Sequence, residues 1–346
     1  MTAEDNCSLQ AQGFVQGSCL VKTETEPERA CQVTLKRQQN SWARLITSIH
    51  LSRPENYLSI YQSGCNLSCR KCHSWHFSKI KEGKFYTPQE ILKEAISYEK
   101  FVTLVEPREK ATAWHAFDTC KCCGSCVLNH KKSAMCPGKI EAKAILYSPQ
   151  GLGPARNIVA FTGGDLTCRP DFYCACSYLI KKHTKLLFLL ETNGFGLTLR
   201  NLDRLHDAGV DSFWLDLKAF TEKKHIWLTG STNDNILKLP AEMIKRNFVL
   251  EVLSLYIPDL VEVDELEKIA LILHGVDPSI PFTILAFFPE YKMKKFRNPT
   301  VQEMVETYHK VKAIGLKNIR LGNLGVFIRT GQDLEYLKNN VDQHAF

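Results

Sequence analysis

Short apolar segments and longer amphipathic segments alternate along the chain from residue 57 onward. The apolar segments have strand length and are rich in β-branched and aromatic residues; they are residues 57–62, 158–162, 186–190, 213–217, 249–256, 282–287 and 319–321. The amphipathic segments repeat apolar residues at helical spacing; they are residues 88–101, 170–183, 197–208, 236–245, 263–273 and 301–313. Because buried apolar strands that alternate with helices form parallel sheets, the pattern predicts an α/β fold. Six or seven such units predict a partial or complete β/α barrel, which places its chemistry in the loops after the strands.

Two parts of the chain fall outside this alternation. Residues 102–156 contain five cysteines and end in a Gly- and Pro-rich stretch, so we expect an insertion within a barrel that covers residues 55–330. Residues 1–54 are polar and irregular, and the pattern assigns no role to them. Residues 331–346 are expected to form a C-terminal tail.

The composition is that of a folded protein with one large domain, since 44% of the 346 residues are hydrophobic. The net charge of +7 is spread along the chain without interleaved aromatic residues, so nucleic-acid binding is not supported. No apolar run approaches the roughly 18 residues that a membrane helix needs. The first residues also lack the pattern of a secretory signal. We therefore expect a cytoplasmic protein with no membrane partner.

Fourteen cysteines are a high number for a protein in a reducing compartment, and they favour metal or cluster binding over disulfides. Cys65, Cys69 and Cys72 form a C-x3-C-x2-C group directly after the first predicted strand. Three thiolates can bind three irons of a [4Fe–4S] cubane and leave the fourth iron open to another ligand. Structural zinc is the alternative, but it normally takes four ligands from paired C-x2-C units, and His73 is the nearby candidate for the fourth.

With this spacing after the first strand, the chain resembles the radical S-adenosylmethionine (radical SAM) superfamily. The resemblance implies a barrel of the radical SAM type, whose cluster binds S-adenosylmethionine at its open iron. It also implies reductive cleavage to a 5′-deoxyadenosyl radical that abstracts a hydrogen atom, with Cys65, Cys69 and Cys72 as metal ligands and catalytic residues. The position before the third cysteine is commonly aromatic in the family and lies beside the adenine; here it is Lys71, and Trp75 is a candidate substitute.

Later segments resemble one branch of this superfamily, the activating enzymes of glycyl-radical enzymes such as pyruvate formate-lyase. Gly163, Gly164 and Asp165 end the second predicted strand. Glycines let a backbone approach a ligand closely, and a carboxylate can bind an ammonium group. In the family, the corresponding Gly-Gly-Glu turn holds the amino group of the cosubstrate, so the resemblance implies this role here. An ordinary turn with an acid at the start of a helix is the alternative.

Two more strand ends match the same branch. Glu191, Thr192 and Asn193 resemble its Asp-Thr-Asn-Gly segment, and Asp216 and Lys218 match its Asp-Leu-Lys segment. The resemblance implies that Lys218 pairs with the carboxylate of S-adenosylmethionine. It further implies that Asp216 and the acid at position 191 line the same pocket, around a monovalent cation. A buried ion pair without function is the alternative, because charges in a barrel mouth need partners.

A second group of cysteines lies in the predicted insertion. Cys120, Cys123, Cys126 and Cys136 follow a C-x2-C-x2-C-x9-C spacing. This spacing resembles a bacterial ferredoxin run, which implies a ferredoxin-like insertion with an auxiliary [4Fe–4S] cluster as an electron relay. A structural zinc site on the same residues is the alternative, and Cys122 can exchange roles with Cys123.

The other cysteines receive no ligand role from the sequence. Cys174 and Cys176 lie on a predicted helix, where cysteine packs as a small apolar residue. This interpretation is favoured over a third cluster that would also include Cys168. The remaining three, Cys7, Cys19 and Cys31, lie in the segment without predicted elements and are not assigned.

The residues leave three classes of function open. The leading one is a radical SAM oxidoreductase that activates a glycyl-radical enzyme and takes electrons from a donor such as ferredoxin or flavodoxin. The second is a radical SAM enzyme that modifies another peptide, an RNA or a small molecule. The third is a non-catalytic iron–sulfur electron carrier or zinc-stabilised interaction protein, which is disfavoured because a carrier gains nothing from an open iron. The sequence identifies neither the hydrogen-atom target nor the oligomeric state.

Overall fold

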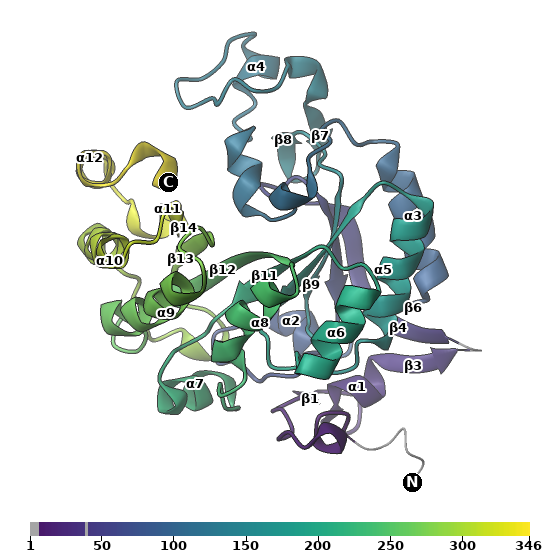
Figure 1. Cartoon of the computed structure of the whole chain (residues 1–346). Helices are drawn as coiled ribbons and strands as arrows, with labels where there is room; N and C mark the ends of the chain where they lie inside the picture. Colours follow the sequence, from purple (N-terminus) through teal and green to yellow (C-terminus); the bar gives the residue numbers. More distant parts are fainter. Residues whose placement is uncertain (1–6, 39–40) are drawn as a thin grey trace.

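The structure is a computed structural model that describes residues 7–38 and 41–346. Within these residues, the main sheet contains seven parallel strands, which lie side by side in the order in which the chain forms them (Figure 1). They are β5 (Leu58–Gln62), β9 (Ile158–Gly163), β10 (Leu187–Thr192), β11 (Ser212–Asp216), β12 (Val249–Tyr256), β13 (Phe282–Ala286) and β14 (Ile319–Gly322). The predicted α/β fold with a mostly parallel central sheet is therefore confirmed, with small shifts at the strand ends.

The predicted helices are also present and cover the sheet. They are α3 (Pro88–Glu99), α5 (Asp171–His183), α6 (Leu199–Asp207), α8 (Leu239–Lys245), α9 (Val263–Val276) and α10 (Val301–Ala313). For example, α3 begins at a capping box made by Thr87 and Glu90. Among the described helices of eight residues or more, two are not predicted by the apolar pattern, namely α7 (Glu222–Thr229) and α12 (Gly331–Asn340). In the described part of the chain, each helix is too short or too polar to cross a membrane.

The barrel is partial because the outer edge of β5 is occupied. An antiparallel strand, β4 (Ser41–Leu51), pairs with β5 there, while β14 lies at the far edge of the sheet. β4 pairs in turn with β3 (Leu35–Gln38) and β6 (Lys84–Tyr86). Since β14 cannot reach the edge that β4 covers, the sheet stays open (Figure 1).

The strands β3 and β4 lie in residues 1–54, to which the sequence pattern assigned no element. Arg44 shows why the sequence pattern did not predict β4. A charged residue inside a strand normally indicates that its side chain faces solvent. Here the side chain of Arg44 is fully buried and donates hydrogen bonds to the backbone oxygens of Gly64 (2.9 Å) and Thr34 (3.2 Å). The strand β4 thus belongs to the sheet, while the domain boundaries drawn from the sequence stay a prediction.

The cysteine-rich segment crosses the N-terminal ends of the barrel strands. It carries the short helix α4 (Ser125–Leu128) and the hairpin β7 (Leu146–Ser148) and β8 (Gly151–Gly153), which lie together at one end of the molecule (Figure 1). Trp114 closes the barrel from this side: its backbone N–H donates to Glu251 (2.7 Å), and its backbone oxygen accepts from Arg320 (2.7 Å).

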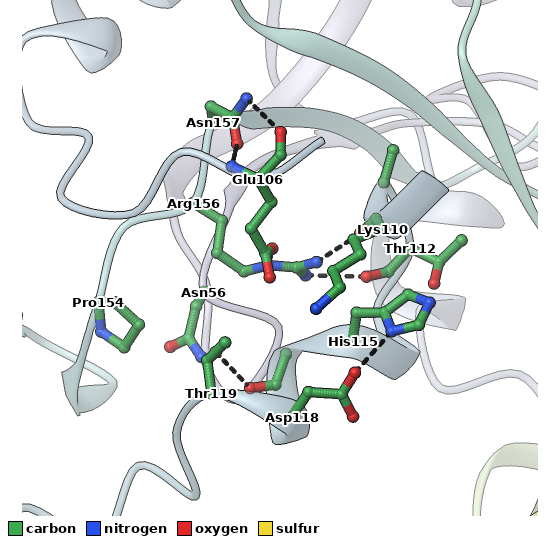
Figure 2. Close-up of polar contacts among 12 residues, drawn as sticks. Asn56, Glu106, Lys110, Thr112, His115, Asp118, Thr119, Pro154, Arg156 and Asn157 are labelled. Carbon is green, nitrogen blue, oxygen red and sulfur yellow. Dashed lines mark hydrogen bonds and ion pairs between the residues drawn. The ribbon is translucent and has the colours of Figure 1, made fainter. Parts of the chain in front are cut away.

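Arg156 anchors this segment to the barrel. Its guanidinium is fully buried, pairs with Glu106, and donates to the backbone oxygens of Lys110 (2.6 Å) and Thr112 (2.8 Å) (Figure 2). Asn157 holds the backbone of Glu106 from the other side (Figure 2). A buried guanidinium needs such a full set of partners. Arg156 therefore fixes the end of the cysteine-rich segment directly before β9.

Inside the barrel, a carboxyl group at the end of β10 has an unusual environment. Glu191 accepts hydrogen bonds from the hydroxyls of Tyr57 (3.0 Å) and Thr162 (2.5 Å). Burial raises the pKa of Glu191 to about 8, although the hydrogen bond from Thr162 acts in the opposite direction. Near neutral pH this side chain is therefore mostly protonated in the folded protein.

The raised pKa of Glu191 predicts a pH dependence of stability. Between its ordinary pKa of 4.5 and the folded value of about 8, the folded protein holds a proton that the unfolded chain releases. Rising pH then favours unfolding across this window, and the effect ends above pH 8. We expect the free energy of unfolding, measured in urea at pH 5 to 8, to fall more steeply for the native chain than for Glu191→Gln. Parallel curves for the two proteins would contradict this.

Candidate functional site

The three cysteines of the triad lie in one loop between β5 and the short helix α2 (Trp75–Ser78). Cys65 and Cys69 are buried, and Cys72 is half-buried. Backbone hydrogen bonds hold the loop against the C-terminal end of the barrel: Asn66 donates to Asp165 (2.8 Å), Ser68 to Thr229 (2.9 Å) and Arg70 to Leu228 (2.7 Å). The loop is thus fixed at three points, one on the turn after β9 and two at the C-terminal end of α7.

The two glycines after β9 are required by contact with this loop. A Cβ on Gly164 would lie 2.2 Å from the backbone oxygen of Gly64. Gly163 has a φ of +85°, and a Cβ there would lie 2.6 Å from the ring of Phe77. Only glycine fits at both positions. The close approach that the sequence pattern indicated is therefore made, in this structure, to the protein's own backbone and side chains.

The three thiols share one electrostatic environment. Burial raises the pKa of the Cys69 thiol to about 12; Lys218 opposes this shift, and the thiols of Cys72 and Cys65 add to it. Burial likewise raises the pKa of Cys65, with Lys79 as the main opposing charge. Lys79 also donates a hydrogen bond to the backbone of the loop at Leu67. Lys79 and Lys218 can therefore balance the negative charge of thiolates at these positions.

This donor set fits a cubane cluster with one open iron. His73, the candidate for a fourth zinc ligand, has a side chain that is 79% exposed and contacts Glu290 (3.1 Å). Among the residues that the structure describes, no three His, Cys, Asp or Glu side chains are grouped so that they could hold a metal ion as they stand. The thiolates of a cubane each bind a different iron and do not have to meet at one point. The three thiols of this loop can therefore each bind one iron, and the two lysines oppose their negative charge.

Asp165 connects the turns after β9 and β10. One carboxylate oxygen accepts from the backbone N–H (2.8 Å) and the hydroxyl (2.8 Å) of Thr167. The other accepts from the hydroxyl of Thr192 (2.7 Å) and the backbone N–H of Asn193 (3.0 Å). All four bonds stay within the protein, so the observed role of this carboxylate is to hold the two turns together. Its binding of an amino group stays a prediction.

Asn193 brings the third strand end into contact with the triad. Its side-chain amide donates to Asn66 (2.8 Å) and lies 3.6 Å from the sulfur of Cys65. Its own oxygen accepts from the backbone N–H of Phe195 (2.9 Å), which fixes the orientation of the amide. Of the three residues predicted here, Asn193 contacts the triad, Thr192 supports Asp165, and Glu191 lies further inside the barrel.

Asp216 and Lys218 form an ion pair at the end of β11, beside the triad. Burial lowers the pKa of Lys218, but Asp216 and the thiols of Cys69 and Cys72 outweigh this, so the pKa lies above its usual value. The lysine therefore stays charged and faces the cysteines. The predicted pair is present and next to the proposed cluster ligands.

Four buried polar atoms on the triad loop, on β11 and on α7 have no hydrogen-bond partner within the described residues. They are Nδ2 of Asn66, Nε1 of Trp214, Oδ1 of Asp216 and Nε2 of His225. Buried polar groups are normally paired, so the unpartnered oxygen of Asp216, in the ion pair beside the triad, fits a polar ligand. The sequence analysis singled out Asp216 among them and missed the other three, because an Asn, a Trp and a His that stand alone carry no spacing signal.

The position before the third cysteine has an aromatic partner from another loop. The ammonium of Lys71 lies 3.4 Å from the ring centre of Phe288 and pairs with Glu290 (2.8 Å). Trp75, the predicted substitute, instead stacks on Tyr291 with ring centres 5.1 Å apart. Both contacts join the triad loop to the loop after β13, which the sequence did not link to the site.

The second cysteine group lies at the other end of the barrel. The backbone N–H of Cys122 donates to the sulfur of Cys120 (3.3 Å), and the sulfur of Cys122 contacts Asn56 (3.2 Å), just before β5. The triad follows the opposite end of β5, so the five residues of this strand, at about 3.3 Å each, separate the two groups by roughly 17 Å. The predicted electron relay from this group would have to span this distance, and it stays a prediction.

The predicted ligands of the auxiliary site are only partly drawn together. Cys123 is exposed and its sulfur lies 3.4 Å from the hydroxyl of Ser133, while the backbone N–H of Cys136 bonds to the carbonyl of the same serine (3.0 Å). Cys126 lies on α4. The choice between iron–sulfur and zinc at Cys120, Cys123, Cys126 and Cys136 stays open.

Comparison with known proteins finds similarity over part of the chain. Residues 119–270 match the family model described as the radical SAM superfamily, a segment that begins after the triad. A curated protein of Methanocaldococcus jannaschii, named "Putative glycyl-radical enzyme activating enzyme", is 33% identical over 139 residues. That match covers 37% of this chain and 49% of the relative, so the chain spans about half the length of the curated protein it matches.

Similar solved structures include two proteins of low sequence identity to this chain. A domain of pyruvate-formate lyase-activating enzyme from Bacteroides vulgatus is 16% identical, covers 48% of this chain and 98% of its own, and has a TM-score of 0.41. SuiB from Streptococcus suis is 12% identical, covers 82% of this chain and 51% of its own, and has a TM-score of 0.49. Over residues 119–270 the chain is thus similar to the radical SAM superfamily, and its three-cysteine loop lies at the mouth of a partial β/α barrel.

Proposed function

We propose that this protein binds a [4Fe–4S] cluster at Cys65, Cys69 and Cys72 and uses it to cleave S-adenosylmethionine reductively. The observation that carries the proposal is the three-thiol loop at the barrel mouth, set against the charged pair Asp216–Lys218. When bound, the cluster supplies the electron that releases a 5′-deoxyadenosyl radical, and this radical abstracts a hydrogen atom. The residues around it bind and orient the cosubstrate.

The charged and unpartnered groups of the site suit the polar end of S-adenosylmethionine. Lys218 stays protonated beside the thiols, so it can pair with the carboxylate of the methionine moiety. The free oxygen of Asp216 can accept from its amino group, and so take the role that Asp165 cannot fill while its four hydrogen bonds are kept. Lys71 and Phe288 offer an aromatic and polar contact for the adenosine end.

The substrate is proposed to be a glycine Cα in a partner glycyl-radical enzyme. The curated relative's name and the matching strand ends at positions 163–165, 191–193 and 216–218 support this. The electron donor would be of the ferredoxin or flavodoxin type, and we expect the protein to act in the cytoplasm. An auxiliary cluster at Cys120, Cys123, Cys126 and Cys136 remains part of the proposal.

Replacing one triad cysteine tests the cluster directly. In anaerobically reconstituted Cys69→Ala, we expect iron at the triad to be lost and reductive formation of 5′-deoxyadenosine to fall at least 100-fold, because the cubane loses one of its three anchors. Cys174→Ala is the matched control, since Cys174 is half-buried on α5 and outside the site. Cleavage at the native rate by Cys69→Ala would contradict the assignment.

Lys218→Met removes the charge but keeps the length of the side chain. We expect the affinity for S-adenosylmethionine to weaken by about tenfold or more, which corresponds to roughly 1.4 kcal/mol, as measured by equilibrium dialysis with protein normalised to its iron content. The exposed Lys182→Met, on α5, serves as the control. Equal affinities for the two variants would show that Lys218 does not bind the carboxylate.

The activating role requires a separate experiment. The reduced protein and S-adenosylmethionine are mixed with a glycyl-radical enzyme from the same genome, and the electron paramagnetic resonance signal of a glycyl radical is recorded. We expect the signal with native protein and none with Cys69→Ala. If 5′-deoxyadenosine forms but no glycyl radical appears with any such partner, the activating role is wrong while the cleavage chemistry stands.

A further inference from the structure

Four cysteines that the sequence left without a role come together behind the triad loop. Three of them lie in the N-terminal segment, at Cys7, Cys19 and Cys31, and are separated by eleven residues each. The fourth, Cys168, follows the Gly-Gly-Asp turn after β9. None of the four takes part in the site described above, and no sequence spacing connects them.

The backbone arranges these cysteines in two pairs. The short strands β1 (Leu20–Val21) and β2 (Glu28–Arg29) form a ladder, and the backbone oxygen of Cys19 accepts from Ala30 (2.8 Å), next to Cys31. The hydroxyl of Ser8, next to Cys7, donates to the backbone oxygen of Cys168 (2.8 Å). These two connections bring the segment of Cys19 next to that of Cys31, and the segment of Cys7 next to that of Cys168.

The two pairs lie within electrostatic range of each other. Burial first, and then nearby ionisable groups, raise the pKa of the Cys168 thiol; these groups are Cys31, Asp165, Cys19 and Cys7. Burial also raises the pKa of Cys19, and Cys31 and Cys7 add to it. Each of these two thiols thus has the other members of the group among its neighbours, whereas Cys174 and Cys176 are not among them.

Two of the four cysteines are buried, and the other two are partly accessible to solvent. Cys19 and Cys168 are buried, while Cys7 and Cys31 are half-buried and packed against the same apolar core. Single cysteines often fill a core as small apolar residues. Four thiols from four segments that lie within electrostatic range of one another are better explained by a shared ligand.

We propose that Cys7, Cys19, Cys31 and Cys168 bind an iron–sulfur cluster of the four-thiolate type. Structural zinc is disfavoured because it is typically held by closely spaced C-x2–4-C pairs, which this group lacks. In a cubane each thiolate binds its own iron, so the ligands can come from four separate segments.

The proposed site lies directly against the triad loop. Gly17 packs so closely on the backbone of Asn66 that a Cβ there would lie 2.3 Å from its oxygen. Ser18, adjacent to Cys19, accepts a hydrogen bond from the backbone N–H of Ser68 (2.8 Å), between the first and second triad cysteines. The cysteines of the insertion lie at the other end of the barrel, so this group is the one beside the triad.

Iron and sulfide counts test the proposal without relying on catalysis. The full chain is reconstituted anaerobically as native protein, as Cys19→Ser/Cys168→Ser and as the control Cys174→Ser, with folding checked by circular dichroism. We expect the double variant to lose about four irons and four sulfides per chain relative to native protein, and the control to lose none. Unchanged counts in the folded double variant would overturn the proposal.

A second variant covers the case in which the double variant does not fold. Replacing the three triad cysteines and the five insertion cysteines by alanine leaves the proposed ligands as the main remaining thiols. We expect this protein to bind about four irons and to give an electron paramagnetic resonance signal on reduction. Zinc in place of iron, no bound iron, or a disulfide among these cysteines found by mass spectrometry would each overturn the proposal. Loss of 5′-deoxyadenosine formation in this variant is expected regardless, so it does not decide the question.

Discussion

The carboxylate of Asp165 is the contact on which the geometry of the site depends. It accepts four hydrogen bonds, two from its own turn at Thr167 and two from the turn after β10. The backbone of the same residue accepts from Asn66 in the triad loop. One residue thus ties together the ends of β5, β9 and β10, and with Gly164 packed on Gly64 it leaves the triad loop little freedom. A buried carboxylate stabilises such a junction because every acceptor position is used.

The sheet separates the cysteines into two locations, which differ in their distance from the triad. The insertion group lies before β5, held by Asn56 and the anchor at Arg156. The N-terminal group and the triad both lie after the strands, where Gly17 and Ser18 touch the triad loop. Electron transfer weakens steeply with distance. The N-terminal segment therefore lies nearer to the triad than the insertion does, and the relay expected from the ferredoxin-like spacing stays a prediction.

The sequence predicted the barrel well because its strands are buried on both faces and so are continuously apolar. The same rule failed for β4, whose buried Arg44 resembles a surface residue until Gly64 and Thr34 are seen to accept its hydrogen bonds. For the site, closely spaced residues such as Cys65 and Cys69 could be found, as could residues at strand ends such as Lys218. No local pattern indicates isolated residues such as Trp214 and His225. The same holds for the contact of Ser8, next to Cys7, with the backbone of Cys168, because it joins distant segments.

The central claim is that the cluster held by the triad keeps one iron open for S-adenosylmethionine. Its most direct test is the electron paramagnetic resonance spectrum of the reduced, reconstituted protein with and without S-adenosylmethionine. If the cosubstrate binds the open iron, the spectrum of the triad cluster should change when it is added, and the same change should be absent from any cluster with four thiolates. A triad signal that is identical with and without saturating S-adenosylmethionine would contradict the account.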